Sequence, residues 1–204
     1  MTATTAAFLS ARTGRLTASN MWRAMSFLKS GKESEERRKY KIELLAERMT
    51  GDVVPHYVND LMRWGLDTEP EAKSAYETST GVLLLPCGTI PHPAIENFSA
   101  TPDSLIGRTA VFEAKCPQTT THLAWKMAGG VPDQHKPQCL AQLACTGRSD
   151  VVFVSYDPRV PERQRLFIVD WTPDPDEIAA VEAAARQFLA EVDAMWEALN
   201  TEAT

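Results

Sequence analysis

Apolar positions follow two different spacings along this chain, and these spacings predict its secondary structure. Short apolar runs bounded by turn residues predict strands at residues 82–85, 88–90, 104–106, 109–112, 151–156 and 166–169. Apolar residues at helical spacing predict helices near residues 21–25, 35–49, 58–78, 122–128, 137–145 and 174–199, with an interruption or local bend at Pro70. Helices that interrupt a set of strands predict an α/β fold in which a central mixed β-sheet is flanked by helices.

The last of these segments carries the clearest helix signal. Asp174 can cap the helix, Pro175 suits its first turn, and Glu177 completes a capping pattern. An apolar stripe follows at helical spacing and comprises Ile178, Val181, Ala185, Phe188, Leu189, Val192, Trp196 and Leu199. We expect this stripe to pack on the sheet, although part of it could join subunits.

Length and composition narrow the class of protein. The 204 residues predict a single domain, residues 1–204, with a substantial core. The apolar runs are too short and too interrupted for a signal peptide or a membrane span. The four cysteines form no Cys-x-x-Cys pair, which argues against a zinc ribbon and a disulfide framework. We therefore expect a protein of the reducing cytoplasm that does not interact with a membrane.

The formal net charge of −6 is distributed unevenly along the chain. Residues 1–50 contain ten Lys or Arg and five Asp or Glu, whereas residues 170–204 contain one Arg and nine acids. We expect the first segment to face phosphate groups and the last to avoid them. The alternative is that both segments are ordinary solvated helix faces.

The strongest chemical signal is a predicted hairpin. The apolar runs at 104–106 and 109–112 flank Gly107 and predict two strands joined by a tight turn. This turn brings Asp103, at the start of the first strand, near Glu113 in the second. Two carboxylates that converge in this way suit a metal site, although the Asp-x9-Glu-x-Lys pattern taken alone also occurs in solvated hairpins.

The second strand of this hairpin separates charged from apolar side chains. Side chains alternate along a strand, so Glu113 and Lys115 share one face, while Phe112, Ala114 and Cys116 share the other. Two carboxylates and the backbone carbonyl of Ala114 suit the oxygen coordination that Mg²⁺ prefers. A lysine ammonium beside the metal can hold an attacking water or help to deprotonate it. The pattern is therefore typical of a nuclease that hydrolyses phosphodiesters.

The chain resembles a known nuclease family in sequence blocks that occur in the family's order. The blocks are residues 12–19, 64–72, 101–117, 138–147 and 156–159. They are similar to those of bacteriophage lambda exonuclease and the YqaJ-type viral recombinase nucleases, within the PD-(D/E)xK nuclease superfamily, and they span most of the chain. The resemblance implies a PD-(D/E)xK fold and a Mg²⁺-dependent double-stranded DNA 5′-to-3′ exonuclease, in which Mn²⁺ can substitute.

The same resemblance implies a biological setting. The substrate is linear double-stranded DNA with a 5′-phosphate, and the product is a 3′ single-stranded overhang for phage-type recombination. The implied partners are a single-strand annealing protein and two further copies of the chain in a toroidal homotrimer. The implied location is the cytoplasm of a bacterial host.

The resemblance also implies roles at both ends of the site. Arg12 and Ser19 match the residues that bind the terminal 5′-phosphate, and Thr17 lies in the same block. From the residues alone, Arg12 has the planar fork for this role, and Ser19 could instead cap the following helix. Met62 falls where the lambda enzyme has an apolar wedge that separates the strands, although a methionine is more often part of the core. Lys29, in a polar loop, is expected to contact the DNA backbone.

At the catalytic end, Glu69 matches an additional acid of the family beside the metal. The predicted metal ligands are therefore Asp103, Glu113, the backbone carbonyl of Ala114 and Glu69, and the predicted catalytic residues are Asp103, Glu113, Lys115, Glu69 and Gln138. Lambda-like enzymes have two glutamines two positions apart on this helix, whereas here Gln138 is followed by Leu140 and then Gln142. Gln138 is the stronger candidate for orienting the water or the phosphate.

Three other readings compete with the exonuclease. A structure-specific or restriction-like endonuclease would share the catalytic residues but would cut closed circular DNA and would not need Arg12 and Ser19. An iron–sulfur nuclease is disfavoured by the arrangement of the cysteines. A non-catalytic recombination scaffold is disfavoured because Asp103, Glu113 and Lys115 are all present.

Overall fold

The computed structural model describes residues 12–55 and 59–201. Its helices are the 3-10 helix η1 (Ala18–Asn20) and the α-helices α2 (Met21–Ala24), α3 (Glu35–Thr50), α4 (Asp60–Thr80), α5 (Thr119–Ala128), α6 (Lys136–Thr146), α7 (Glu162–Arg165) and α8 (Pro175–Thr201). Its strands are β1 (Leu16–Thr17), β2 (Ile90–Pro91), β3 (Phe98–Ala100), β4 (Ser104–Ile106), β5 (Ala110–Lys115), β6 (Asp150–Tyr156) and β7 (Leu166–Trp171). The predicted α/β class is confirmed.

The strands form two sheets. The larger sheet has the order β4-β5-β6-β7, with β5 and β6 parallel and the outer pairs antiparallel, and it is the central mixed sheet that the sequence predicts. The smaller sheet has the order β1-β3-β2. The predicted strand at 88–90 overlaps β2 only at Ile90. The sequence did not indicate β1 or β3, because strands of two or three residues are too short to show an alternating pattern.

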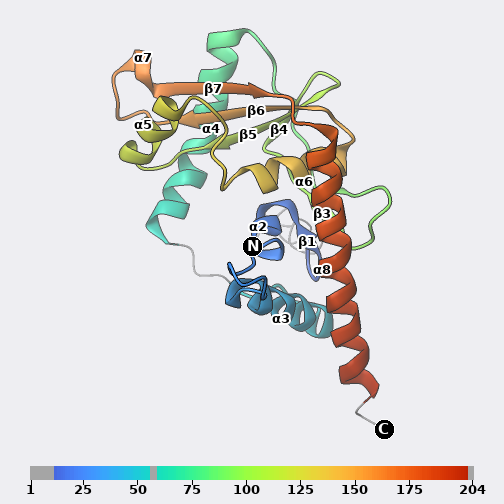
Figure 1. Cartoon of the computed structure of the whole chain (residues 1–204). Coiled ribbons are helices and arrows are strands. Elements are labelled where there is room, and N and C mark those ends of the chain that lie inside the picture. Colours follow the sequence, from blue (N-terminus) through green and yellow to red (C-terminus); the bar gives the residue numbers. More distant parts are fainter. Residues whose placement is uncertain (1–11, 56–58, 202–204) are drawn as a thin grey trace.

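Helices cover both faces of the larger sheet (Figure 1). On one face α4 contributes Ala72 and Tyr76, and the Tyr76 ring lies 5.0 Å from that of Phe112 in β5. On the other face Cys139 of α6 joins an apolar cluster with Val111. Alternation along β5 therefore directs the even-numbered residues towards α4 and the odd-numbered residues, Glu113 included, towards α6.

Helix α8 extends beyond the larger sheet and packs against α3 (Figure 1). Its buried face, formed by Val181, Ala185, Phe188, Leu189 and Val192, lies in the largest apolar cluster, together with residues of α2, α3, α6 and the smaller sheet. The predicted stripe is thus mostly internal, while Leu199 near its end is exposed. Neither α8 nor any other helix within 12–55 and 59–201 is long and apolar enough to cross a membrane.

The structure corrects two of the predicted elements. Residues 82–85 do not form a strand, since only Leu85 makes an isolated bridge, to Leu105, and Leu83 is 75% exposed. Helix α4 runs from Asp60 to Thr80 with Pro70 inside it, so the predicted interruption is wrong, while the alternative of a local bend stays a prediction. The apolar run therefore reflects a segment beside β4, and α4 has buried residues on both sides of Pro70, namely Thr68, Ala72 and Tyr76.

Candidate active site

The predicted hairpin is present and brings two carboxylates together. Strands β4 and β5 pair from Ser104 and Phe112 to Ile106 and Ala110, and Gly107 turns the chain with a φ of 49°. Asp103 precedes β4, and its Oδ2 accepts a hydrogen bond of 2.7 Å from the backbone N–H of Ala114. Asp103 therefore lies beside the backbone that connects Glu113 to Lys115.

Glu113 is fully buried, and three side chains donate to its carboxylate. Lys115 Nζ and Gln138 Nε2 each donate to Oε1 at 2.5 Å, and Gln142 Nε2 donates to Oε2 at 2.5 Å. The two glutamines lie four positions apart and hence on one face of α6. Gln142 was not among the predicted residues, although its four-residue spacing from Gln138 was a signal for it as well.

Electrostatics in this cluster favour a bound cation. Burial raises the pKa of the Asp103 carboxyl well above its usual value, and the charges of Glu113 and Glu69 raise it further. Burial alone would lower the pKa of Lys115, but Glu113 and Asp103 more than offset it and raise this pKa. Lys115 is therefore an ammonium at neutral pH that can donate to a phosphate or a water.

Glu69 lies near the cluster but is paired with a lysine that was not among the predicted site residues. Lys73, one turn further along α4, binds Glu69 Oε1 at 2.7 Å and donates to the backbone carbonyl of Asp103 at 2.7 Å. Within the described parts of the chain, no group of three His, Cys, Asp or Glu side chains is close enough to hold a metal ion. Asp103, Glu113 and the Ala114 carbonyl fit a hard divalent cation, whereas Glu69 is paired with Lys73.

The predicted phosphate-binding residues also lie together. Arg12 donates to the hydroxyl of Ser19 at 3.2 Å and to that of Thr101 at 3.3 Å, and the hydroxyls of Thr17 and Ser19 are 3.3 Å apart. Ser19 lies inside η1 and makes no capping bond there, so the capping interpretation is wrong. Burial lowers the pKa of the Arg12 guanidinium.

One cavity is lined by a residue from each of the two groups, Ser19 and Gln138. It has a volume of about 370 Å³ and is lined by Ser19, Trp22, Gln134, His135 and Gln138. Ser19 belongs to the group around Arg12, and Gln138 is bonded to Glu113. Burial, aided by the charge of Lys115, lowers the pKa of His135 to about 4, so the imidazole in this wall is neutral. The cavity therefore offers hydrogen-bonding groups and an aromatic ring between the hydroxyls and the carboxylates.

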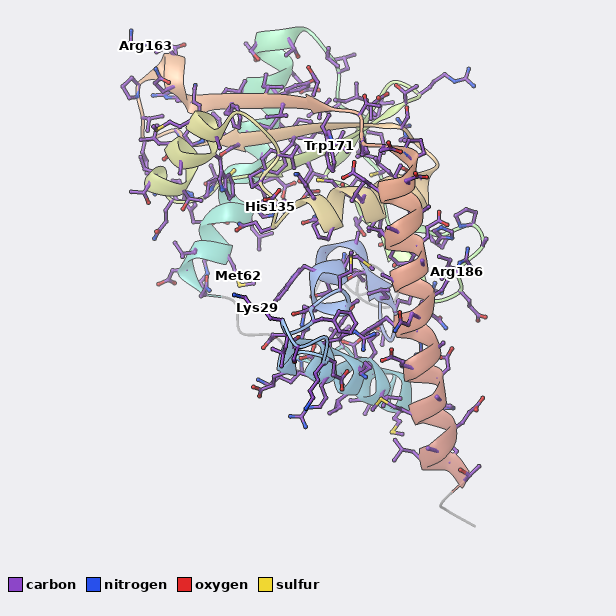
Figure 2. All side chains as sticks on the ribbon, viewed as in Figure 1. Lys29, Met62, His135, Arg163, Trp171 and Arg186 are labelled. Atoms are coloured by element: carbon purple, nitrogen blue, oxygen red, sulfur yellow. The ribbon has the colours of Figure 1, made fainter. Side chains whose placement is uncertain are left out.

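Met62 and Lys29 lie at the surface. Figure 2 shows Met62 at the N-terminal end of α4 and Lys29 in the loop between α2 and α3. Met62 is 52% exposed, so its interpretation as a core residue is wrong. None of the contacts described for this chain links either residue to the acidic cluster. Their predicted contacts with DNA stay predictions.

The last sequence block has a structural role that sequence reasoning did not identify. Asp157 is fully buried and accepts hydrogen bonds from Thr119 at 2.5 Å and from Arg159 at 2.7 Å. Burial would raise the pKa of Asp157, but these hydrogen bonds lower it to about 2. The guanidinium of Arg159 lies 4.6 Å from the ring centroid of Trp64 in α4. Residues 156–159 therefore link the end of β6 to the start of α5 through Thr119 and to α4 through Trp64.

The fold is that of the PD-(D/E)xK class of nucleases, and it brings together Asp103, Glu113 and Lys115, which the sequence predicts to be catalytic. The sequence profile of the YqaJ-like viral recombinase domain matches residues 7–149. The chain belongs to this family. The comparison with curated proteins gives no match.

Solved structures resemble the whole chain. The alkaline exonuclease LHK-Exo from Laribacter hongkongensis is 35% identical, with 97% of each chain covered and a TM-score of 0.89. LHK-Exo in complex with dAMP has the same identity and coverage, with a TM-score of 0.90. A phage-related exonuclease from Haemophilus somnus 129PT is 15% identical, covers 93% of this chain and 96% of its own, and with a TM-score of 0.64 shows a shared fold.

Proposed function

We propose that this protein is a Mg²⁺-dependent exonuclease that degrades one strand of linear double-stranded DNA from its 5′ end. The observation that carries the proposal is the cavity that is lined both by Ser19, which is bonded to Arg12, and by Gln138, which donates to Glu113. An enzyme that cuts near a strand end needs such a connection between an end-binding site and a cleavage site. The similarity to alkaline exonucleases, one of them solved with dAMP, supports this substrate class.

The residues divide the reaction between them. Arg12, Thr17 and Ser19 bind the terminal 5′-phosphate through a guanidinium and two hydroxyls. Asp103, Glu113 and the Ala114 carbonyl hold Mg²⁺, for which Mn²⁺ can substitute, and Glu69 adds negative charge beside them. The metal supplies a Lewis acid for a phosphate oxygen.

Two polar side chains act on the scissile group itself. The Lys115 ammonium donates to the attacking water or to the charge that grows on the phosphate. Gln138, which lines the cavity and donates to Glu113 through its Nε2, orients the same group. Because both residues donate to Glu113 Oε1, they are fixed relative to the carboxylates before DNA arrives.

Outside the site, we extend the proposal to the substrate path and the assembly. Lys29 contacts the DNA backbone, and Met62 separates the strands so that the 5′ strand enters the site. The 3′ overhang passes to a single-strand annealing protein. A toroidal homotrimer in the bacterial cytoplasm would keep the enzyme on its substrate, because a closed ring does not readily leave a duplex.

A cleavage assay tests the proposal. The protein is incubated with Mg²⁺ and a linear duplex that carries a 5′-phosphate and a label on one strand, and with relaxed closed circles, with and without a chelator. We expect progressive loss of the 5′ strand, intact circles, and no cleavage with chelator. Cut circles would favour the endonuclease, and intact linear DNA would favour the scaffold. The Asp103→Asn variant, which keeps the size of the side chain, controls for a contaminating nuclease.

A further inference from the structure

Gln142 is a buried polar side chain whose role the proposed reaction does not require. It is fully buried within a run of α6 residues that are all buried, from Cys139 to Cys145. Its Nε2 donates to Glu113 Oε2, and its Oε1 is buried with no hydrogen-bond partner in the described residues. A buried unpaired carbonyl is destabilising, and a buried apolar side chain of the same volume would avoid it.

The orientation of this amide is explained by the Glu113 carboxylate. If the amide of Gln142 were turned over, its oxygen would face Glu113 Oε2, and both atoms would be acceptors. The observed orientation satisfies the charged group and leaves the neutral oxygen unpaired. Hydrogen bonds to charged groups are stronger than those between neutral groups, so the observed orientation of the amide has the lower free energy.

The two oxygens of Glu113 have different surroundings. Oε1 is bound by Lys115 and Gln138, both partly exposed, and Gln138 lines the 370 Å³ cavity. Oε2 is bound by Gln142, which is not exposed. No other donor in the described residues reaches Oε2. Gln142 therefore fixes the rotation of the carboxylate, with Oε2 directed inwards and Oε1 towards the open side.

We infer that Gln142 is a positioning residue, which acts through Glu113 to present Oε1 to the divalent cation. The inference rests on the proposed function, since it concerns the proposed metal ligand. Partners that orient a metal ligand typically change metal affinity or activity about 10- to 100-fold when they are removed. Gln142 differs from Gln138 because it reaches neither the cavity nor, through it, the DNA.

Calorimetric titration of Mg²⁺ into the protein without DNA tests the inference. Methionine has nearly the size of glutamine but no donor, so Gln142→Met removes the bond to Oε2. We expect Mg²⁺ to bind about 10- to 100-fold more weakly to this variant. The matched control is Gln187→Met, at an exposed glutamine of α8. Gln142→Asn, whose shorter amide cannot reach Oε2, should behave like Gln142→Met and serves if the methionine variant does not fold.

Two further readouts separate positioning from a purely structural role. We expect kcat for linear duplex to fall while KM stays at the wild-type value. Gln142→Met leaves the buried Glu113 Oε2 without its donor, so its Tm should be lower, and we expect Mg²⁺ to raise this Tm less than it raises the Tm of the wild type. If the wild type binds Mg²⁺ and folded Gln142→Met or Gln142→Asn binds it with the same affinity, the inference is overturned while the proposed function stands. A wild-type protein that binds no Mg²⁺ would overturn the proposed function and the inference with it.

Discussion

Replacing Lys115 by methionine should separate cleavage from DNA binding. Lys115 Nζ donates to Glu113 Oε1 at 2.5 Å, and a hydrogen bond to a charged group contributes about 1.5–3 kcal/mol. Gln138 and Gln142 still donate to Glu113 in the variant, so the loss of stability should stay near the lower end of that range. The loss in rate should be larger, about 100- to 1,000-fold, because a donor aimed at the developing charge is removed.

Single-turnover cleavage of a 5′-labelled duplex measures the rate, and fluorescence anisotropy with the same duplex measures end binding. We expect end binding to remain, since Arg12 and Ser19 are unchanged. Lys39→Met is the control, because Lys39 is an exposed lysine of α3 that pairs only with neighbours on the same helix. A rate within threefold of the control, about 0.65 kcal/mol, would refute the assignment of Lys115 to the reacting group.

Three further predictions concern other parts of the molecule. Arg12→Ala should lose the preference for 5′-phosphorylated over 5′-hydroxyl ends, measured as a ratio of cleavage rates, and an unchanged ratio would exclude Arg12 from end binding. Lys73→Met should remove the hydrogen bond to the Asp103 carbonyl, leave that predicted ligand less firmly positioned and slow cleavage about tenfold with end binding unchanged, whereas a wild-type rate would show that this contact is incidental. Glu191→Gln should lower the free energy of unfolding at pH 7 by about 1–2 kcal/mol, since the hydrogen bond from Arg37 lowers the pKa of Glu191 to about 2 and solvent screens part of the effect. That difference is complete above the unfolded pKa near 4.5 and should shrink in urea titrations as the pH falls towards 2, so a difference that does not depend on pH would contradict it.

The parts of the site that the sequence predicted are local ones. The hairpin, its turn at Gly107 and the shared face of Glu113 and Lys115 follow from alternation over a few residues, and each is present. The contact between Arg12 and Thr101 joins residues 89 positions apart, and no local pattern indicates it. Arg12 was predicted only because it lies in a block shared with the family, and Thr101 was not predicted as its partner.

The parts that the sequence missed depend on tertiary packing. The Lys73 ammonium reaches the Asp103 carbonyl because α4 packs on the face of the larger sheet, where it contacts β5, β6 and β7. Strand β3 was missed although Phe98 and Ala100 are buried, because three residues show no period. The run at 82–85 was overinterpreted because a short apolar run does not distinguish a strand from a segment that lies along a sheet edge.

Helix α4 also sets a length scale for the substrate. Met62 and Glu69 are seven positions apart, two helical turns, so their side chains leave the same face of the helix about 10 Å apart. The bases of one DNA strand follow each other every ~3.4 Å, so this span corresponds to about three nucleotides. If Met62 separates the strands and Glu69 marks the cleavage site, α4 fixes the distance between these two points. About three base pairs must then open before a terminal phosphodiester is cut. The energy needed for this opening would make cleavage slower at G·C-rich ends than at A·T-rich ends.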